Sequence, residues 1–314
     1  MRVLVTGGAG FIGSHSVEAL LAAGAEVVVL DNFSSGKRAN LPVPTDRLTV
    51  VEGDIRDPAA VARATERATH VLHLAAQVSV RASVEDPGNS CSQNVLGFVN
   101  VLDAARRGGV RCVAYASSAA VYGTPRELPL TEASPTAPIS PYGLEKLIDE
   151  QYAALFGELY GLPTLGLRYF NVYGPRQDPG SQYAGVISKF ADAVAAGAPL
   201  TIFGDGSQTR DFVYVGDVAR ANVAALRSGQ TGIANVGTGT SVTLIELVES
   251  LERVAGRKAD RRFADAVAGD IRHSAMTPQR MLELAGGRAP TSLGAGLAAL
   301  LASVGQRSAI GSQV

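Results

Sequence analysis

The chain has 314 residues, 46% of them hydrophobic, and a formal net charge of −1. This balance offers no attraction to nucleic acid or to a membrane surface, and the length suits one large or two modest globular domains. The apolar runs are too short to cross a bilayer, the amino terminus has no secretory pattern, and there are only two cysteines. These features together predict a cytoplasmic protein.

The first predicted strand, residues 3–5, leads directly into a glycine-rich turn and then into a helix that ends near Gly24. Gly7, Gly10 and Gly13 lie in this turn. Glycines let the backbone approach a ligand closely, and the start of a helix offers free N–H groups and the positive end of a dipole. The pattern therefore predicts a pyrophosphate site; the alternative is a tight turn that binds nothing.

A second apolar run, residues 27–30, ends in Asp31, about twenty residues after the glycines. A carboxylate at this place accepts hydrogen bonds from both ribose hydroxyls of an adenosine and repels a 2′-phosphate. Asp31 therefore predicts NAD rather than NADP as the cofactor. The alternative is an aspartate that only shapes the turn before Asn32.

Further apolar runs predict strands at residues 48–51, 71–74, 111–116 and 165–169, with helical patterns at 58–67 and 89–107 between them. Strands and helices that alternate in this way are typical of a Rossmann-type, doubly wound parallel sheet of the α/β class. Ligands bind at the carboxyl ends of the strands in such sheets. The predicted strand ends carry Gly7, Asp31, Asp54, Ala75 and Ser118.

After residue 170 the pattern becomes irregular, with short helices predicted at 183–196, 215–227 and 244–255 and a frayed tail from about residue 306. We interpret this part as a smaller, loop-rich C-terminal α/β domain that binds the substrate. The predicted NAD-binding domain is residues 1–170, to which residues 211–236 return. The predicted substrate domain is residues 171–210 and 237–314. The four histidines show no metal-ligand spacing with Cys91 and Cys112, so no metal site is predicted.

Ser140 and Pro141 predict the start of a helix that places Tyr142 and Lys146 on one face, four residues apart. An ammonium group beside a phenol stabilises the phenolate, so Tyr142 is a candidate general base and acid, and Ser118 could hydrogen-bond the same substrate oxygen. The alternative is a surface pair without a role. The helix also carries more apolar residues than one sheet face needs, which predicts a homodimer interface or else an extended core: Leu144, Leu147, Ile148, Tyr152, Leu155 and Phe156.

Taken together, these stretches resemble the extended short-chain dehydrogenases/reductases that act on nucleotide sugars, from Met1 to about Met281. The resemblance lies in residues 6–13, 31–32, 53–55, 73–76, 117–123, 142–146, 168–175 and 210–215. In that family, residues placed like Ser118, Tyr142 and Lys146 form the catalytic triad. Residues placed like Asn171, Arg210 and Arg272 hold the nucleotide diphosphate of the substrate.

The resemblance implies a full set of binding residues. Its cofactor contacts are Gly7, Gly10, Phe11, Ile12, Gly13, Asp31, Asn32, Ser35, Gly36, Asp54, Ile55, Leu74, Ala75, Ala76, Asn94, Ser117, Tyr142, Lys146 and Tyr169. Its substrate contacts are Ser118, Asn171, Val186, Lys189, Thr201, Phe203, Arg210, Arg272 and Ser274. No metal ligand is among them.

Within the family, Ala119 and Ala120 stand where the nucleotide-sugar dehydratases carry an acid and a base, and the related decarboxylases usually keep the glutamate at the second place. The residues at 168–171 and 176–179 most resemble those of the UDP-hexose 4-epimerases, which implies reversible oxidation at sugar carbon 4 with tightly bound NAD. Ser274 matches a sugar-pocket position where a small residue admits a 2-acetamido group. The alternatives are a nucleotide-sugar 4-reductase, a simple dehydrogenase, a UDP-glucuronate 4-epimerase, a dehydratase-like enzyme and a non-catalytic NAD-sensing regulator.

Overall fold

The computed structural model describes residues 1–178, 185–266 and 271–311, with side chains described as far as residue 305. Its main sheet has seven strands in the order β10-β6-β5-β4-β1-β2-β3, and all neighbours are parallel. The predicted doubly wound parallel sheet is therefore confirmed. The strands are β1 Arg2–Thr6, β2 Glu26–Asp31, β3 Leu48–Glu52, β4 His70–His73, β5 Cys112–Ser118, β6 Thr164–Tyr169 and β10 Gly232–Val236.

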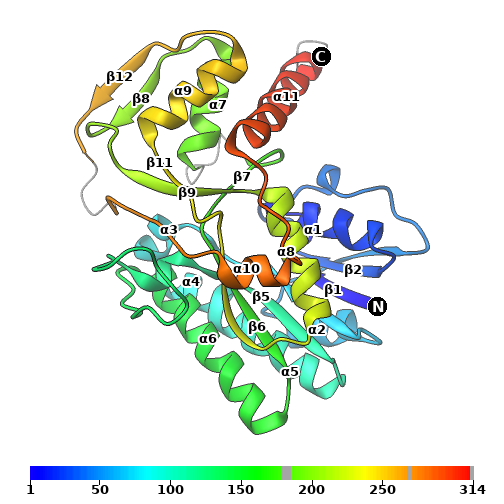
Figure 1. Cartoon of the computed structure of the whole chain (residues 1–314). Helices are drawn as coiled ribbons and strands as arrows, with labels where there is room; N and C mark the ends of the chain where they lie inside the picture. The colour runs from blue at the N-terminus through cyan, green and yellow to red at the C-terminus, as the bar shows by residue number, and fades with distance from the viewer. Residues whose placement is uncertain (179–184, 267–270, 312–314) are drawn as a thin grey trace.

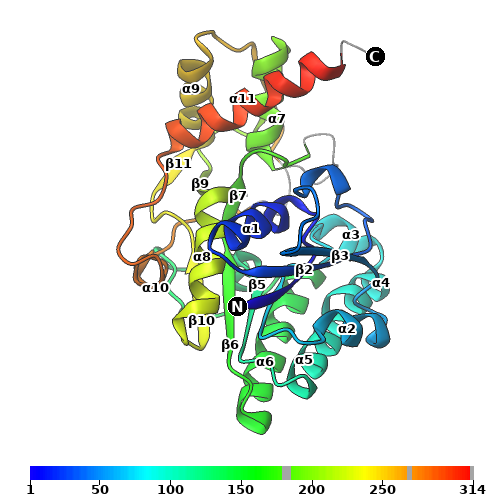
Figure 2. The same cartoon turned by 90° about the vertical axis from the view of Figure 1, so that its right-hand side faces the viewer.

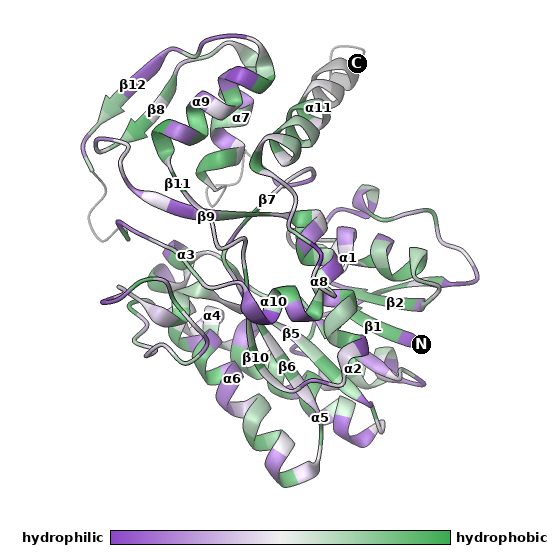
Figure 3. Ribbon diagram, in the orientation of Figure 1, coloured by the Kyte–Doolittle hydropathy of each residue, from purple (hydrophilic) through white to green (hydrophobic). Residues whose placement is uncertain are grey.

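Alternate residues of the central strands feed two separate cores, because neighbouring side chains of a strand point to opposite faces. Val3 and Val5 of β1 pack under α1 (Phe11–Ala22) and α8 (Val215–Ser228). Leu4 faces the other side, which is covered by α2 (Pro58–Thr65), α5 (Gly97–Arg107) and α6 (Pro141–Tyr160). Figures 1 and 2 show helices on both faces, and Figure 3 shows β1 and β2 apolar along most of their length.

The helix predicted at residues 89–107 is not a regular α-helix. The chain forms α3 (Val80–Glu85) and α4 (Pro87–Cys91), then a π-helical turn over Ser92–Leu96 that leads into α5. Periodicity alone cannot reveal such a turn, because one turn of a different pitch leaves the apolar pattern almost intact. The π turn carries Asn94, whose side chain is completely buried.

A smaller unit lies above the main sheet in Figure 1. Its strands form a three-stranded sheet of β7 (Asn171–Tyr173), β9 (Thr209–Tyr214) and β11 (Ser241–Thr243) and a parallel pair of β8 (Leu200–Phe203) and β12 (Arg261–Ala264). The helices α7 (Val186–Ala196), α9 (Leu244–Ala255) and α11 (Leu293–Gly311) enclose its core. The short α10 (Gln279–Leu284) packs near α8 and β10.

The carboxyl-terminal prediction is wrong for residues 306–311. The backbone of α11 stays helical as far as Gly311, and the helix is anchored by Leu297 and Leu300, which are buried in the small unit. Residues 312–314 lie outside the described residues, as do residues 183 and 184 at the start of the helix predicted at 183–196. Among the helices that the structure describes, none has the length and apolarity needed to cross a bilayer.

Candidate functional site

The glycine turn between β1 and α1 is shaped to admit a ligand group at close range. Gly7 has φ +68°, and a side chain there would place its Cβ 2.7 Å from the backbone of Ala75. A Cβ on Gly13 would lie 2.1 Å from the carbonyl oxygen of Gly7. Gly10 is the N-cap of α1 and provides no side-chain hydrogen bond, so the first N–H groups, beginning at Phe11 and Ile12, stay available to an anion. The turn therefore fits a dinucleotide pyrophosphate.

Asp31, the last residue of β2, is buried beside this turn. Its Oδ2 accepts a hydrogen bond from the N–H of Ala9 at 2.9 Å, and its Oδ1 accepts one from Phe33 at 2.8 Å. The loop that contains Ser35 folds back on the turn, where a Cβ on Gly36 would lie 3.0 Å from Asp31 Oδ1. The structure thus brings the predicted ribose carboxylate to the edge of the predicted pyrophosphate site.

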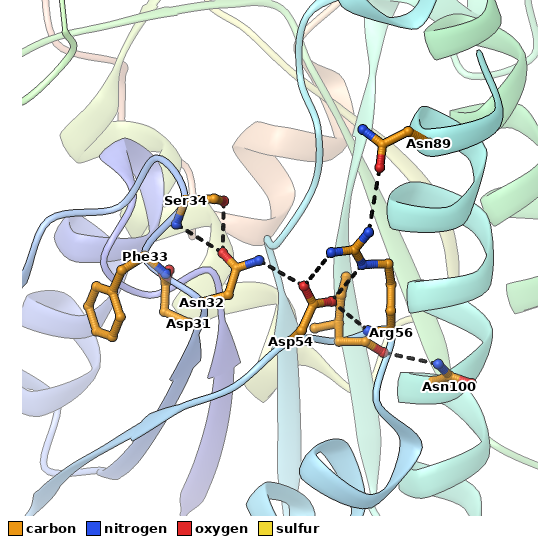
Figure 4. Close-up of polar contacts among 9 residues, drawn as sticks. Asp31, Asn32, Phe33, Ser34, Asp54, Arg56, Asn89 and Asn100 are labelled. Carbon is orange, nitrogen blue, oxygen red and sulfur yellow. Dashed lines mark hydrogen bonds and ion pairs between the residues drawn. The ribbon is translucent and has the colours of Figure 1, made fainter. Parts of the chain in front are cut away.

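Figure 4 shows the polar network next to Asp31. Asn32 Nδ2 donates to Asp54 Oδ2 at 3.0 Å, and Arg56 donates to both oxygens of Asp54, at 3.0 and 2.7 Å. The hydrogen bonds from Arg56 hold the pKa of Asp54 well below its usual range, so Asp54 is an ionised acceptor at the end of β3. The carbonyl of Ile55 accepts from Asn100 at 3.0 Å, which fixes the backbone that follows.

Leu74, Ala75 and Ala76 follow β4 and form the other side of the glycine turn, with the Leu74 N–H bonded to the Thr6 carbonyl at 3.1 Å. Asn94 supports this segment from behind. Its Oδ1 accepts from Gln77 at 2.8 Å, while its Nδ2 donates to the Gln77 carbonyl at 2.9 Å and to Glu145 at 2.6 Å. The polar atoms of the Asn94 side chain are thus engaged within the protein, where they hold the loop at Gln77.

The three predicted catalytic residues come from β5 and α6. Ser118 ends β5, and its Oγ accepts from the N–H of Ala120 at 3.1 Å. Tyr142 is half-buried in the first turn of α6, where its N–H donates to Ser83 Oγ at 3.1 Å. Lys146 lies one turn later and is completely buried, and its ammonium donates to Asp149 Oδ2 at 3.1 Å. A phenol, an ammonium group and a hydroxyl therefore come from two elements, β5 and α6, that pack on one another. Together these three groups can move a proton to and from a substrate oxygen.

A buried ion pair joins β6 to α6, the helix that carries Tyr142 and Lys146. The sequence patterns do not indicate this pair. Arg168 of β6 donates to both oxygens of Glu150 on α6, at 2.8 and 2.7 Å, and to the hydroxyl of Tyr122 at 2.8 Å. Ser117 Oγ also donates to Glu150, at 2.5 Å, so its side chain serves this pair. Such two-point Arg–carboxylate contacts fix geometry as well as charge.

Tyr169, predicted to contact the cofactor, pairs with Ser118 across β5 and β6. Its hydroxyl donates to Asn222 at 2.6 Å, and burial raises its pKa. Tyr169 is therefore a neutral phenol at neutral pH, held within the protein by Asn222.

The predicted diphosphate ligands gather around β9. Arg210 lies on β9, and the backbone of Thr209 next to it pairs with Arg272 at 2.9 Å and with Ser274 at 3.2 Å. Asn171, at the start of β7, donates its side-chain N–H to the carbonyl of Asp211 at 3.1 Å. Two guanidinium groups and an amide thus come from adjoining segments, and their positive charge and N–H donors suit a diphosphate.

Four further predicted substrate residues lie in the small unit. Val186 and Lys189 belong to α7, and Thr201 and Phe203 belong to the neighbouring β8. Phe203 has 48% of its surface exposed, and its carbonyl accepts from Gln208 at 2.7 Å. Asp205, in the loop between Phe203 and Gln208, contacts Arg272 at 3.5 Å, so the end of β8 adjoins Arg272. In the described part of the chain, no three His, Cys, Asp or Glu side chains are grouped to hold a metal ion.

Comparisons with known proteins show the family to which this chain is similar. A model of the NAD dependent epimerase/dehydratase family matches residues 3–237. The UDP-glucose 4-epimerase of Mycolicibacterium smegmatis is 42% identical over 305 residues, covering 95% of this chain and 96% of that protein. The crystal structure of the Thermus thermophilus UDP-glucose 4-epimerase with NAD is 43% identical, with 97% of this chain and 99% of that chain covered and a TM-score of 0.89. The UDP-N-acetylglucosamine 4-epimerase of Methanobrevibacter ruminantium, in complex with UDP-N-acetylmuramic acid, is 37% identical, with 98% of each chain covered and a TM-score of 0.93.

Proposed function

This chain belongs to the NAD-dependent epimerase/dehydratase family, and on that basis we propose that it is a UDP-hexose 4-epimerase that interconverts UDP-glucose and UDP-galactose. The observation that carries the proposal is the buried Lys146 one turn from Tyr142 on α6, with Ser118 ending β5. Ala119 and Ala120 follow Ser118 and have no group that can move a proton. The site can therefore oxidise and reduce a carbon that bears a hydroxyl, but it lacks the extra acid and base of a dehydratase.

The glycine turn, Asp31 and Asp54 are the residues that would hold NAD. NAD supplies the acceptor for the hydride of sugar carbon 4 and later the donor that returns it. In the mechanism that we propose, Tyr142 removes the proton from the 4-hydroxyl and later returns it to the same oxygen. Lys146 stabilises the phenolate form of Tyr142, and Ser118 hydrogen-bonds the sugar oxygen as its charge changes.

Epimerisation also needs a sugar that can turn over while its nucleotide stays bound. Asn171, Arg210 and Arg272 lie around β9 and would anchor the diphosphate, since two guanidinium groups can chelate its oxygens. We propose that the unit built on residues 171–210 and 237–314 binds the nucleotide and that residues 1–170 and 211–236 bind NAD. An anchored diphosphate leaves the hexose as the mobile part.

The proposal is tested by ¹H NMR of purified protein with UDP-glucose and no added cofactor. An epimerase yields UDP-galactose catalytically, because the cofactor is regenerated in each cycle. A 4-reductase or a simple dehydrogenase needs nicotinamide cofactor supplied in proportion to product, and a non-catalytic NAD-sensing protein gives no product. UDP-glucuronate, offered in parallel, distinguishes an epimerase of that sugar.

Ser274 leads us to propose that UDP-N-acetylglucosamine is also a substrate, as the name of the Methanobrevibacter relative suggests for that protein. Ser274 is half-buried and adjoins Arg272 on the strand edge at Thr209. Ser274→Tyr is expected to abolish turnover of the N-acetyl sugars and to leave UDP-glucose turnover within about threefold, because a bulky ring fills the space for the acetamido group. Ser274→Ala, the matched control, should keep both activities, and an equal loss of both in Ser274→Tyr would reject this pocket assignment.

We propose that the protein is a homodimer that pairs through α6. The part of the predicted apolar stripe that stays exposed includes Leu144, Tyr152 and Leu155, and Leu159 extends it with 62% of its surface exposed. Phe156 is buried in the core under the sheet and does not belong to the exposed stripe. A long apolar stripe on one helix is typical of an interface.

Sedimentation is expected to show a dimer for the native chain and a monomer for the double variant Leu155→Glu and Leu159→Glu, because two buried carboxylates would oppose association. Val43→Glu, on an exposed loop, is the control and should remain dimeric. A native chain that sediments as a monomer at micromolar concentration would contradict the interface.

We also propose a cytoplasmic location. Its support is that Cys91 and Cys112 are free thiols, one exposed and one buried, as suits a reducing compartment. Oxidation state in the cell, measured by thiol labelling of fresh extracts, tests it: both thiols should react as free after unfolding.

A further inference from the structure

A buried cluster of charges lies behind Tyr142 on α6. The Lys146 ammonium donates to Asp149 Oδ2 at 3.1 Å, and the two side chains are only 2% and 1% exposed. The second oxygen of Asp149 is buried and has no hydrogen-bond partner in the described structure. This carboxylate is therefore committed to Lys146 and to no other group.

The other charges near this pair have partners of their own. Glu150 is neutralised by Arg168, and Glu145 accepts from the neutral groups of Ser90 at 2.8 Å and Asn94 at 2.6 Å. His73 is completely buried, and burial lowers its pKa to about 3, so it is neutral. Among the described residues, Asp149 is thus the carboxylate that forms an ion pair with Lys146.

A buried ammonium group without a counterion loses its proton easily, because burial disfavours the charged form. Burial alone would lower the pKa of Lys146, but the charge and hydrogen bond of Asp149, together with the charges of Tyr142 and Glu145, outweigh burial and raise that pKa above its ordinary value. Burial raises the pKa of Asp149 to about 6, so the carboxylate is ionised at pH 7 and above. The pair therefore consists of two charged groups at pH 7 and above.

We propose that Asp149 is a positioning residue, which keeps the Lys146 ammonium charged and fixed beside Tyr142 and so acts on the reaction through Lys146. The inference rests on the proposed function only where it concerns turnover, since that function gives Lys146 its task. The charge and position of Lys146 are properties of the protein alone. An unpaired Lys146 would be both less often protonated and free to adopt other rotamers, and each effect weakens its support of the phenolate.

Among the described residues, Asp149 is the carboxylate within ion-pair distance of Lys146. The other titratable side chains whose charge acts on the pair are Tyr142, Glu145 and Glu150 on α6, His73 on β4 and Tyr115 on β5. Glu145 is held by Ser90 and Asn94. Burial keeps Tyr115 neutral, and Glu150 is held by Arg168. On the neighbouring helices, charged residues form ion pairs within their own helix at the surface: Arg81 with Glu85 on α3, and Asp103 with Arg106 on α5.

A titration of lysine side chains tests the inference directly, because the chain contains only four lysines: Lys37, Lys146, Lys189 and Lys258. The NAD-loaded protein is labelled with ¹³Cε-lysine, and the Lys146 signal is identified by its absence in Lys146→Met. In the native protein this signal should show no titration up to pH 10.5. In Asp149→Asn its midpoint should fall by at least one pH unit, a tenfold change in proton affinity.

Turnover supplies a second measurement. Loss of Asp149 lowers the pKa at which Lys146 loses its proton, so the basic limb of the kcat profile in Asp149→Asn should move to lower pH by the same interval. Asp149→Glu, which keeps the charge, should retain the native limb. Asp217→Asn is the structural control, since Asp217 is an equally buried carboxylate on α8 that bonds Thr291, and its variant should lower the unfolding temperature without moving the limb.

The inference is overturned if Lys146 of the native protein titrates below pH 10.5, or if its midpoint in Asp149→Asn is unchanged. The first result does not use Asp149→Asn and so does not depend on whether that variant folds. A native protein that fails to turn over any UDP-hexose would instead reject the proposed function, while the lysine titration would still decide the role of Asp149.

Discussion

Tyr142→Phe is expected to lower kcat for UDP-glucose about 10²- to 10⁴-fold, the range that a positioned general acid–base contributes. The variant removes one oxygen atom from a half-buried ring and leaves the backbone bond from Tyr142 to Ser83 Oγ in place. The fold and the glycine turn should therefore be unaffected. The rate is measured by ¹H NMR of the UDP-glucose to UDP-galactose conversion, and bound NAD is measured in the same preparation.

Tyr160→Phe is the matched control for this loss, since Tyr160 ends the same helix and half of its surface is exposed. It should turn over UDP-glucose at close to the native rate. A Tyr142→Phe variant that binds NAD and keeps more than a tenth of native kcat would show that another group moves the proton. Loss of NAD together with activity would point instead to a structural role for Tyr142.

Gly13→Ala is expected to weaken NAD binding by roughly 10²- to 10⁴-fold, which corresponds to the loss of about two hydrogen bonds to a charged group. The new Cβ would stand 2.1 Å from the carbonyl oxygen of Gly7, and this neighbour is backbone that cannot rotate away. The turn must open, and the N–H groups at the start of α1 then lose their common direction. Overpacking of this kind also costs about 1–3 kcal/mol of stability.

Gly294→Ala provides the control for any general effect of adding a methyl group. Gly294 lies in α11 with no atom within 4 Å of an added Cβ, so the variant should bind NAD normally and be slightly more stable. Calorimetric titration with NAD and thermal unfolding of each variant measure the two effects. Native NAD affinity in Gly13→Ala would mean that the pyrophosphate does not lie on this turn.

Much of the main sheet could be predicted because its signals are local. Runs of three to six mainly apolar residues end in small or polar residues, and each predicted strand from β1 to β6 is present within about two residues. The α6 start was equally local, since Ser140 caps the helix by accepting from the N–H of Gly143 at 3.1 Å. The tight turn after β1 could also be predicted from its glycines, because the space at Gly7 and Gly13 excludes any side chain.

The features that were missed depend on contacts between distant parts of the chain. Arg168 and Glu150 are eighteen residues apart, and nothing in either stretch indicates that they form a buried pair. In the π turn, the Asn94 side chain forms hydrogen bonds with Gln77 and Glu145, which are far from it in sequence. The ion pair between Asp149 and Lys146 could have been predicted from the sequence, because their i, i+3 spacing places both on one helix face.

The most direct test of the central proposal is to incubate the purified protein with UDP-glucose in D₂O without added cofactor and to follow the sugar by ¹H NMR. Tyr142 exchanges only the hydroxyl proton, and the hydrogen on carbon 4 leaves and returns as hydride. UDP-galactose should therefore appear with its carbon-4 proton fully retained. Unchanged UDP-glucose, or a product that carries deuterium at carbon 4, would contradict the account.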